Sequence, residues 1–504
     1  MQNGAVHRSS WVGRVATWIE KQPAAAFLLF CVVHIVIWTI VPTLLYPNLP
    51  LDLNEALTYG PEWQLGYDKL PPLPWWLVEI MHQLIGTDWS YYLLAQLVII
   101  ATFALIWVTA LPLVGASGAL VSVLIADGLH YYNFTAPKFN HDVIQLPFWA
   151  LATFALYRAL RTGRLWFWVL TGFALGVAFW AKYFVPLLAI PMALFVLAEP
   201  TARRVLATPG PYVAIAVGLL VVSPHLAWLI THDFLPLQYV DVRFSEAKSA
   251  WDHLKWPGVF LAGQLFWLIP SFFIALPLVQ PRAASHSKPA DRFDWWYFTT
   301  IVFLPAILLL VSSLISGRRL VTMWGYPFWL FLGLWMVMTA RVLIDRARLE
   351  RVVVIWGIVT ICYVLAFMVD YLVMPFIGTH YRTSLFPGDR LAQEITQRYQ
   401  AATGRRLAYV IADTWLGGNI HNYGATHPRT IIDGKLERVP WVDPADLRAR
   451  GAVVVWTADD RENLPPPYRT ALEQGAQIQP PFDLPMRWGH GIVKVGWAIV
   501  PPAQ

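Results

Sequence analysis

The chain of 504 residues is poor in charge and has only two cysteines. Charged residues make up 13% of it, about half the share of roughly 25% that is usual for a soluble domain. Cys31 and Cys362 both lie inside apolar runs, and their spacing is not that of a metal site. The sequence therefore argues against a soluble enzyme, a disulfide framework and a cysteine-bound metal. It also lacks solenoid-type repeats and low-complexity segments.

Apolar sequence is abundant, with 57% hydrophobic residues and 27 tryptophans. Runs of roughly 20 apolar residues recur, which is the length that crosses a bilayer as a helix. We therefore predict a mainly α fold, a polytopic transmembrane helical bundle of about eleven spans. The expected spans are residues 24–46, 91–112, 116–133, 143–160, 165–181, 183–198, 211–230, 257–279, 296–314, 322–340 and 352–376.

The segment before the first span has no small-residue cleavage site after an apolar run, so we expect a retained helix lying on the membrane, not a signal peptide. The net charge of +6 resides in short loops, which indicates topology and no nucleic-acid binding. Basic clusters precede the first span and follow the fourth, sixth, eighth and tenth. All five lie on one side if the N-terminus is cytoplasmic. The outer face then receives residues 47–90, 134–142, 231–256, 315–321 and everything after about residue 377.

The composition changes near residue 385, where short strand-like segments begin to alternate with amphipathic ones. RRLAYVIAD, PRTIID, GAVVVWTAD and HGIVKVGWAIV are typical of strands. LAQEITQRYQAATG, DPADLRARG and PYRTALEQG are typical of helices. We therefore predict a transmembrane domain over residues 1–378 and a small extracytoplasmic α/β domain over residues 379–504.

The first outer loop is long, aromatic and acidic, with the sequence LDLNEALTYGPEWQLGYDKLPPLPWW. Asp52 and Glu55 are three residues apart, so both carboxylates share one face if the segment is a short helix. Asp68 and Lys69 follow, just before a pair of prolines that stiffens the chain. A solvated loop with a belt of tryptophans is the alternative to a functional site.

A second acidic site lies in the next outer loop, APKFNHDVIQLPFW, where Asn140 and His141 precede Asp142 at the mouth of a span. Asp142 is a candidate catalytic carboxylate. Alternatively, it caps the N-terminus of the following helix, where it would accept hydrogen bonds from free backbone N–H groups. The two roles are compatible.

Three further outer segments carry polar side chains. For their lysine and histidines the alternatives are a lysine extended along the membrane surface and histidines hydrogen-bonded at the interface. The arginine pair opposes the cytoplasmic bias of the other arginines and suits a phosphate group, with lipid-headgroup binding as the alternative. AKYF holds Lys182 and Tyr183. SPHLAWLITHDF holds His225 and His232, and ISGRRLVTMWGYPFW holds Arg318 and Arg319.

Taken together, these motifs resemble the glycosyltransferase family 39-like proteins of the GT-C class. That group includes dolichyl-phosphate-mannose protein mannosyltransferases and the bacterial transferases that add aminoarabinose or galacturonic acid to lipid A and lipopolysaccharide core. The resemblance covers roughly residues 24–340 and lies in the Asp/Glu motif, the Gly-Tyr stretch, the lysine before Pro-Pro-Leu and the second acidic loop. Here the acidic residues are separated, as D-L-N-E, and Leu70 stands between Lys69 and Pro71. The C-terminal segment resembles no family that we can name.

The resemblance implies an inverting transferase that uses a polyprenyl-phosphate-linked sugar and an envelope acceptor, at the periplasmic face of a bacterial inner membrane. It implies catalytic roles for Asp52, Glu55 and Asp142, with Asp52 as the preferred base. Donor-phosphate binding is expected of Lys69, Lys182, Arg318 and Arg319. Substrate binding is expected of Tyr59, Tyr67, Asp68, Asn140, His141, Tyr183, His225 and His232.

Two other functions fit part of the sequence. A transporter or lipid flippase would need charge within its spans, and Asp127 is the main candidate for it. A non-catalytic envelope assembly protein would act through its C-terminal domain. No motif requires a cofactor, although the outer carboxylates could hold a divalent cation. We expect a membrane-embedded monomer whose partners are the donor and a lipid or glycan acceptor.

Overall fold

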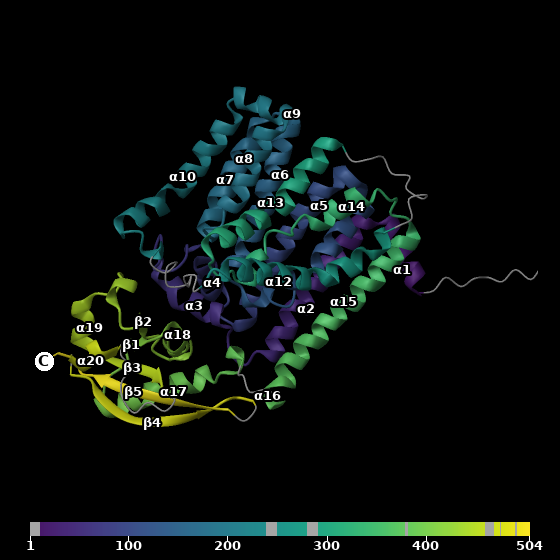
Figure 1. The fold of residues 1–504 in the computed structure, drawn as a ribbon. Coiled ribbons are helices and arrows are strands. Elements are labelled where there is room, and N and C mark those ends of the chain that lie inside the picture. The colour runs from purple at the N-terminus through teal and green to yellow at the C-terminus, as the bar shows by residue number, and fades with distance from the viewer. Residues whose placement is uncertain are drawn as a thin grey trace, which may run out of the picture.

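The apolar runs fold as long helices packed into a bundle, with an α/β domain at one end (Figure 1). The computed structural model describes residues 11–237, 249–279, 291–377, 382–458, 468–473, 475–488 and 491–503. Seven described helices are each long and apolar enough to cross a membrane. The bundle comprises α2 (Pro23–Leu45), α5 (Asp88–Asp127), α6 (His141–Thr162), α7 (Leu165–Ala181), α8 (Pro186–Ala198), α10 (Gly210–Thr231), α12 (Asp252–Ala275), α13 (Arg292–Ser316), α14 (Leu332–Ala340) and α15 (Arg346–Leu372). The predicted polytopic bundle is confirmed, although the described residues give seven helices that could cross a membrane, or eight if the bent pair after α7 counts as one span, where about eleven spans were expected.

Several expected spans are joined or broken. Two of them form the single 40-residue element α5, which breaks at Gly115, where φ is +70° and a side chain would be strained. The span expected at 183–198 is α8, which turns by 92° into the short helix α9 (Pro200–Arg203) and the turn after it. The span expected at 322–340 begins as the 3₁₀ turn Thr322–Gly325 and continues as α14.

Three short helices flank the bundle. The expected N-terminal helix is α1 (Trp11–Lys21), which packs against α15 and is fixed there by Arg346, whose Nη2 donates to the carbonyl oxygen of Gly13 at 3.0 Å. The first outer loop forms α3 (Leu51–Tyr59) and α4 (Leu73–Leu84). Both lie at the end of the bundle that faces the C-terminal domain (Figure 1).

The C-terminal domain is a five-stranded sheet with helices packed against it, so the predicted α/β class is confirmed. The strand order is β2-β1-β3-β5-β4; β2, β1 and β3 are parallel, and β5 and β4 are antiparallel to their neighbours. The strands are β1 (Tyr409–Ala412), β2 (Arg429–Ile432), β3 (Ala452–Thr457), β4 (Gln477–Pro485) and β5 (Ile492–Val500). The helices are α17 (Gly388–Thr403), α18 (Thr414–Tyr423), α19 (Pro444–Arg450) and α20 (Arg469–Glu473), and the four-residue α16 (Met374–Ile377) precedes the domain.

Two of these elements were not predicted from the sequence. Strand β4 contains consecutive prolines, which lack a backbone donor and are tolerated at this sheet edge beside an irregularity between Gln479 and Phe482. Helix α18 contains two adjacent glycines, and its start is stabilised by Asp413, whose side chain accepts from the N–H of Leu416 at 2.7 Å. The expected domain boundary between residues 378 and 379 lies outside the described residues.

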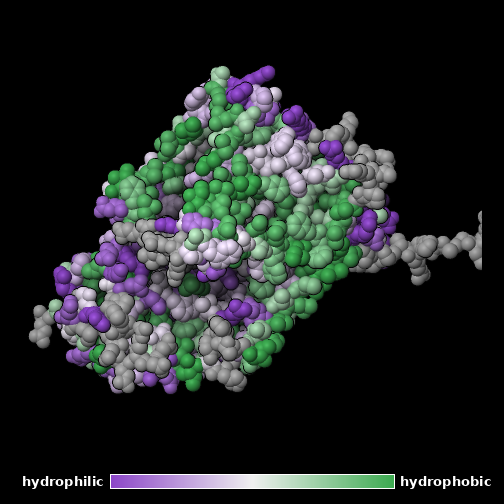
Figure 2. Space-filling view, in the orientation of Figure 1, coloured by the Kyte–Doolittle hydropathy of each residue, from purple (hydrophilic) through white to green (hydrophobic). Residues whose placement is uncertain are grey.

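The two parts of the chain are joined by polar contacts between the first outer loop and the sheet domain. Helix α3 packs on α18, and the Nδ2 of Asn54 donates to the carbonyl oxygen of Trp415 at 3.1 Å. Arg438 forms an ion pair with Asp68 at 2.6 Å. Figure 2 shows apolar side chains over the bundle and many hydrophilic ones over the C-terminal domain. The first outer loop therefore lies between an apolar body and a polar cover.

Candidate active site

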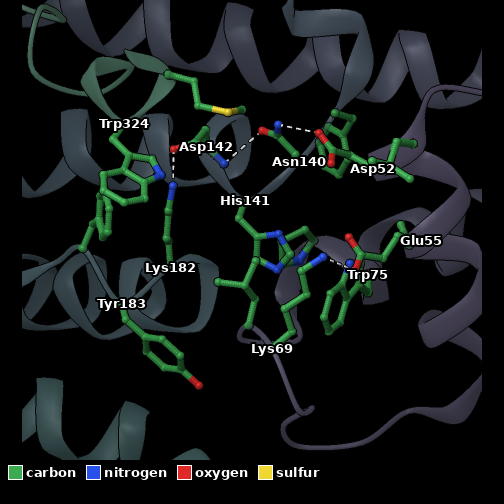
Figure 3. Close-up of a pocket in the computed structure, with 17 residues that line it drawn as sticks. Asp52, Glu55, Lys69, Trp75, Asn140, His141, Asp142, Lys182, Tyr183 and Trp324 are labelled. Carbon is green, nitrogen blue, oxygen red and sulfur yellow. Dashed lines mark hydrogen bonds and ion pairs between the residues drawn. The ribbon is translucent and has the colours of Figure 1, made fainter. Parts of the chain in front are cut away.

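The carboxylates of the first outer loop open into a cavity of about 220 Å³. The predicted short helix is confirmed as α3, and Asp52 and Glu55 both line this cavity from it. Asp52 is half-buried and Glu55 is buried. The remaining walls come from α4, the start of α6, the segment after α7 and the 3₁₀ turn before α14. Residues from four distant parts of the sequence therefore converge on one chamber (Figure 3).

The second acidic loop reaches the same cavity, but Asp142 does not cap α6. The capping residue is Asn140, whose Oδ1 accepts from the backbone N–H groups of Asp142 and Val143 at 3.0 and 3.2 Å. An amide satisfies these donors as well as a carboxylate would. The Asp142 carboxylate is therefore available to accept from Gln145 Nε2 at 3.1 Å and from Lys182.

Two buried carboxylates each hold a lysine. Lys69 Nζ lies 2.5 Å from Glu55 Oε1, and Lys182 Nζ donates to Asp142 Oδ1. The two pairs lie apart in the cavity, and Asn140 lies between Asp142 and Asp52 (Figure 3). Asp52 forms no ion pair within the described part of the chain. Asp52 instead accepts from Asn140 Nδ2 at 2.8 Å. The cavity thus contains two neutralised pairs and one carboxylate without a lysine.

Burial perturbs the ionisable groups that lie outside the spans. Burial raises the pKa of Glu55, and the charge and hydrogen bond of Lys69 oppose that rise. Burial lowers the pKa of Lys138, near the cavity, and the negative charge of Asp52 opposes that fall. Charges in this chamber are therefore poorly solvated and depend on their partners. Such perturbed groups in a cavity are typical of functional sites.

Trp75 and His141 line the cavity, and an aromatic cluster packs behind Trp75. Trp75 stacks on Tyr59 with ring centroids 4.4 Å apart and meets His141 edge-on at 5.0 Å. His141 Nε2 donates to the carbonyl oxygen of Pro71 at 3.0 Å, which ties the second acidic loop to the first.

Three predicted substrate-binding residues form a support beneath the cavity and do not line it. Tyr59 donates its hydroxyl to Asp68 Oδ1 at 2.9 Å, and Tyr67 donates to the carbonyl oxygen of Tyr59 at 2.9 Å. Asp68 also accepts from Arg438 Nε of the C-terminal domain at 2.6 Å. Through Asp68 this network holds the neighbouring residue, Lys69, in place.

The histidines lie farther out. Tyr183 lines the cavity. His225 Nδ1 donates to the carbonyl oxygen of Leu65 at 2.5 Å, so its Nε2 is the acceptor. The hydroxyl of Tyr183 donates to this Nε2 at 2.9 Å. His232 ends α10 and stacks on Trp228 at 4.2 Å. His225 and His232 both stack on Trp228, so the two histidines lie on the same side of α10 at its C-terminal end.

The arginine pair lies outside the lining of the cavity. Arg318 is half-buried and its carbonyl oxygen accepts from Ser313 Oγ at 2.8 Å, whereas Arg319 is exposed over the ring of Trp256, 5.3 Å from its centroid. The next residues of the same connection, Met323 and Trp324, do line the cavity. The described residues include no cluster of three or more His, Cys, Asp or Glu side chains that could hold a metal ion.

Known proteins resemble this chain in sequence and in fold. Residues 69–228 match the family of dolichyl-phosphate-mannose-protein mannosyltransferases. The lipid A galacturonosyltransferase RgtD of Rhizobium johnstonii is 28% identical over 222 residues, which are 43% of this chain and 44% of that protein. The lipopolysaccharide core galacturonosyltransferase RgtA of the same organism is 22% identical over 457 residues, 88% of this chain and 87% of that protein.

The crystal structure of ArnT from Cupriavidus metallidurans bound to undecaprenyl phosphate superposes with a TM-score of 0.63 at 14% identity, over 93% of this chain and 97% of ArnT. Its apo structure gives 0.62, again at 14% identity, over 95% and 98%. These comparisons show the ArnT fold and support a glycosyltransferase of the GT-C type. The comparisons agree with the resemblance seen in the motifs, and they favour a glycosyltransferase over a transporter.

The comparisons do not identify the residues that complete this particular cavity. Phe184 and Trp324 were assigned no role from the sequence, yet both line it, and their rings meet edge-on at 5.4 Å. Phe184 directly follows Tyr183 in AKYF, and Trp324 lies five residues after Arg319 in GRRLVTMW, so both are close in sequence to predicted site residues. Arg438 had no sequence signal, because its partner Asp68 lies 370 residues away.

Proposed function

We propose that the protein transfers a sugar from a polyprenyl-phosphate-linked donor to an envelope acceptor, such as lipid A, lipopolysaccharide core, another glycan or a protein. The observation that carries the proposal is a cavity that contains two carboxylate–lysine pairs and a third carboxylate, Asp52, without an ion pair among the described residues. The names of RgtD and RgtA and the lipid bound to ArnT support a lipid-linked donor and a lipid or glycan acceptor.

The reaction needs a base, a site for the leaving group and a dry cavity. Asp52 takes the proton from the acceptor hydroxyl as its oxygen attacks the anomeric carbon. The bond from that carbon to the phosphate oxygen breaks, and its electron pair leaves with the polyprenyl phosphate. Attack opposite to the leaving group inverts the anomeric configuration.

Cations hold the phosphate without giving it a proton. Lys69 and Lys182 provide positive charge within the cavity, and we assign Arg318 and Arg319 to the lipid phosphate at its edge. Glu55 and Asp142 orient the two lysines and the acceptor hydroxyls. His141 and Tyr183 shape the sugar subsite, with His225 holding the tyrosine ring.

We further propose that the protein lies in a bacterial inner membrane as a monomer, with the cavity and the C-terminal domain in the periplasm. The five basic clusters of the sequence support this orientation. A reporter that is active only in the periplasm should be active when fused after Gln504; activity of a cytoplasm-only reporter at that position would refute the orientation.

Reconstituted protein tests the function directly. Liposomes that hold the purified chain, a polyprenyl-phosphate sugar and lipid A or core oligosaccharide should yield a product heavier by one sugar residue, detected by mass spectrometry. Screening several sugars and acceptors in parallel identifies the preferred pair. Movement of the donor between leaflets, with no new glycosidic bond for any pair, would instead indicate a flippase.

A further inference from the structure

A second polar concavity, of about 510 Å³, lies in the C-terminal domain, separate from the catalytic cavity. It is formed at the N-terminal ends of the parallel strands β1 and β2, with the loop after α17 and the end of α19 as its sides. Its apolar lining is small, so it does not resemble a site for a lipid tail. Its charged and polar lining comprises Arg405, Arg406, Tyr409, Thr426, His427, Arg429, Asp446 and Arg450.

Positive charge dominates this pocket, with four arginines against one carboxylate. That carboxylate, Asp446, is already occupied: it accepts from Arg450 Nε at 2.8 Å and from the hydroxyl of Tyr409 at 2.5 Å. Arg429 pairs with Glu62 of the first outer loop at 3.1 Å. Two of the four arginines are therefore neutralised by the protein itself.

The other two arginines lack such partners. Within the described residues the guanidinium groups of Arg405 and Arg406 form no hydrogen bond or ion pair, and both side chains are exposed at the pocket. The hydroxyl of Thr426, also in the lining, is buried and has no hydrogen-bond partner there. Neighbouring guanidiniums repel each other, and an anion placed between them would remove that repulsion and use their free donors.

We propose that this arginine pocket binds phosphate groups of a phosphorylated glycan, and that this glycan is the acceptor class of the enzyme. The second clause rests on the proposed transferase function. Guanidinium groups match phosphate oxygens with two parallel hydrogen bonds. Since the Arg429–Glu62 pair links the pocket to the loop that carries Asp52, a glycan held here is anchored to the same unit that holds the base.

Binding to the full-length chain tests the pocket. The protein is placed in nanodiscs of phosphatidylcholine and titrated with the deacylated glucosamine disaccharide that carries two phosphates, with the dephosphorylated disaccharide and with inorganic phosphate. The variant is Arg405→Gln with Arg406→Gln. The matched control is Arg398→Gln, on the same domain, whose side chain pairs with Glu394 away from the pocket. All titrations are repeated in Asp52→Asn, which keeps the pocket.

We expect the bisphosphate to bind the native chain and the control roughly 10–100-fold more tightly than the double variant, since each lost charged hydrogen bond costs about tenfold. The dephosphorylated disaccharide should bind weakly to all of them. Equal binding to native and double variant would overturn the pocket. The other informative result is that inorganic phosphate binds the native chain as tightly as the bisphosphate does and loses this binding in the double variant. That result would overturn the proposal that the ligand is a glycan and would leave a site for free phosphate.

The Asp52→Asn titrations separate this proposal from the proposed function. If the bisphosphate binds the Asp52→Asn variant tightly but the native enzyme transfers no sugar to it, the pocket is a phosphate-binding site and the glycan is not the acceptor. A native transferase whose KM for phosphorylated acceptor is unchanged in the double variant would also overturn that role.

Discussion

At the scale of single residues, Asp52 differs from the other two carboxylates of the cavity because it holds no lysine within the described structure. We expect Asp52→Asn to lower kcat by about 10²–10⁴, the usual contribution of a general base, with little change in the KM for donor. Asp483→Asn, an exposed change on β4, should match the native rate. Initial rates of sugar transfer, measured for both variants and the native chain, test this expectation. A native rate for Asp52→Asn together with an inactive Glu55→Gln would move the base one helical turn along.

The Glu55–Lys69 pair should set the acid limit of the enzyme. Because burial raises the pKa of Glu55 above its ordinary value of 4.5, this carboxylate takes up a proton at a higher pH than an exposed one and then releases Lys69. Activity should therefore fall as the pH drops through that raised pKa. In Glu55→Gln the acid limb of kcat/KM should move to lower pH. An acid limb that stays in place would show that another group controls it.

At the scale of secondary-structure elements, the packing of α3 on α18 positions the candidate base. A Cβ added at Gly418 of α18 would lie 2.6 Å from both Asn54 Nδ2 and Thr58 Oγ1 of α3. Gly418→Ala should therefore displace α3, lower the free energy of unfolding by about 1–3 kcal/mol and slow transfer. Gly258→Ala on α12, where the added atom meets nothing within 4 Å, is the control. Thermal unfolding and transfer rates that are equal in the two variants would contradict this role.

Elements set by local composition were predictable, and those set by tertiary packing were not. Apolar length alone indicated the bundle, and the three-residue spacing of Asp52 and Glu55 indicated their shared face. The capping of α6 by Asn140 was missed because Asp142 suits that role equally well in sequence. Strand β4 was missed because its prolines argue against a strand unless its edge position is known. The lysine partners of Glu55 and Asp142, 14 and 40 residues away, depend on the fold.

At the scale of the whole molecule, the junction between the two domains should be sensitive to acid. Burial lowers the pKa of His421, on α18, from 6.5 to about 4. Between these values the unfolded chain binds a proton that the folded chain does not, so the stability present at neutral pH is lost as the pH falls from 6.5 towards 4. The thermal unfolding midpoint in detergent should drop across this window.

His421→Asn provides the comparison for that experiment. An asparagine amide can replace the Nδ1 donor to the carbonyl oxygen of Pro428, 3.1 Å away, and does not titrate. The variant should therefore lose less of its unfolding midpoint between pH 7 and pH 5 than the native chain. An identical decrease in both proteins would assign the acid sensitivity to other groups.

The ion pair between Asp68 and Arg438 also has a consequence for biosynthesis, because 370 residues separate its members. Ribosomes add about 5–20 residues per second, so the first outer loop waits on the order of 20–70 s for the segment that fixes it. Asn54 waits similarly for Trp415, 361 residues later. The nascent chain therefore inserts its helices with an unfinished cavity. Chains that stop short of residue 438 should remain incompetent for transfer even when every span is in place.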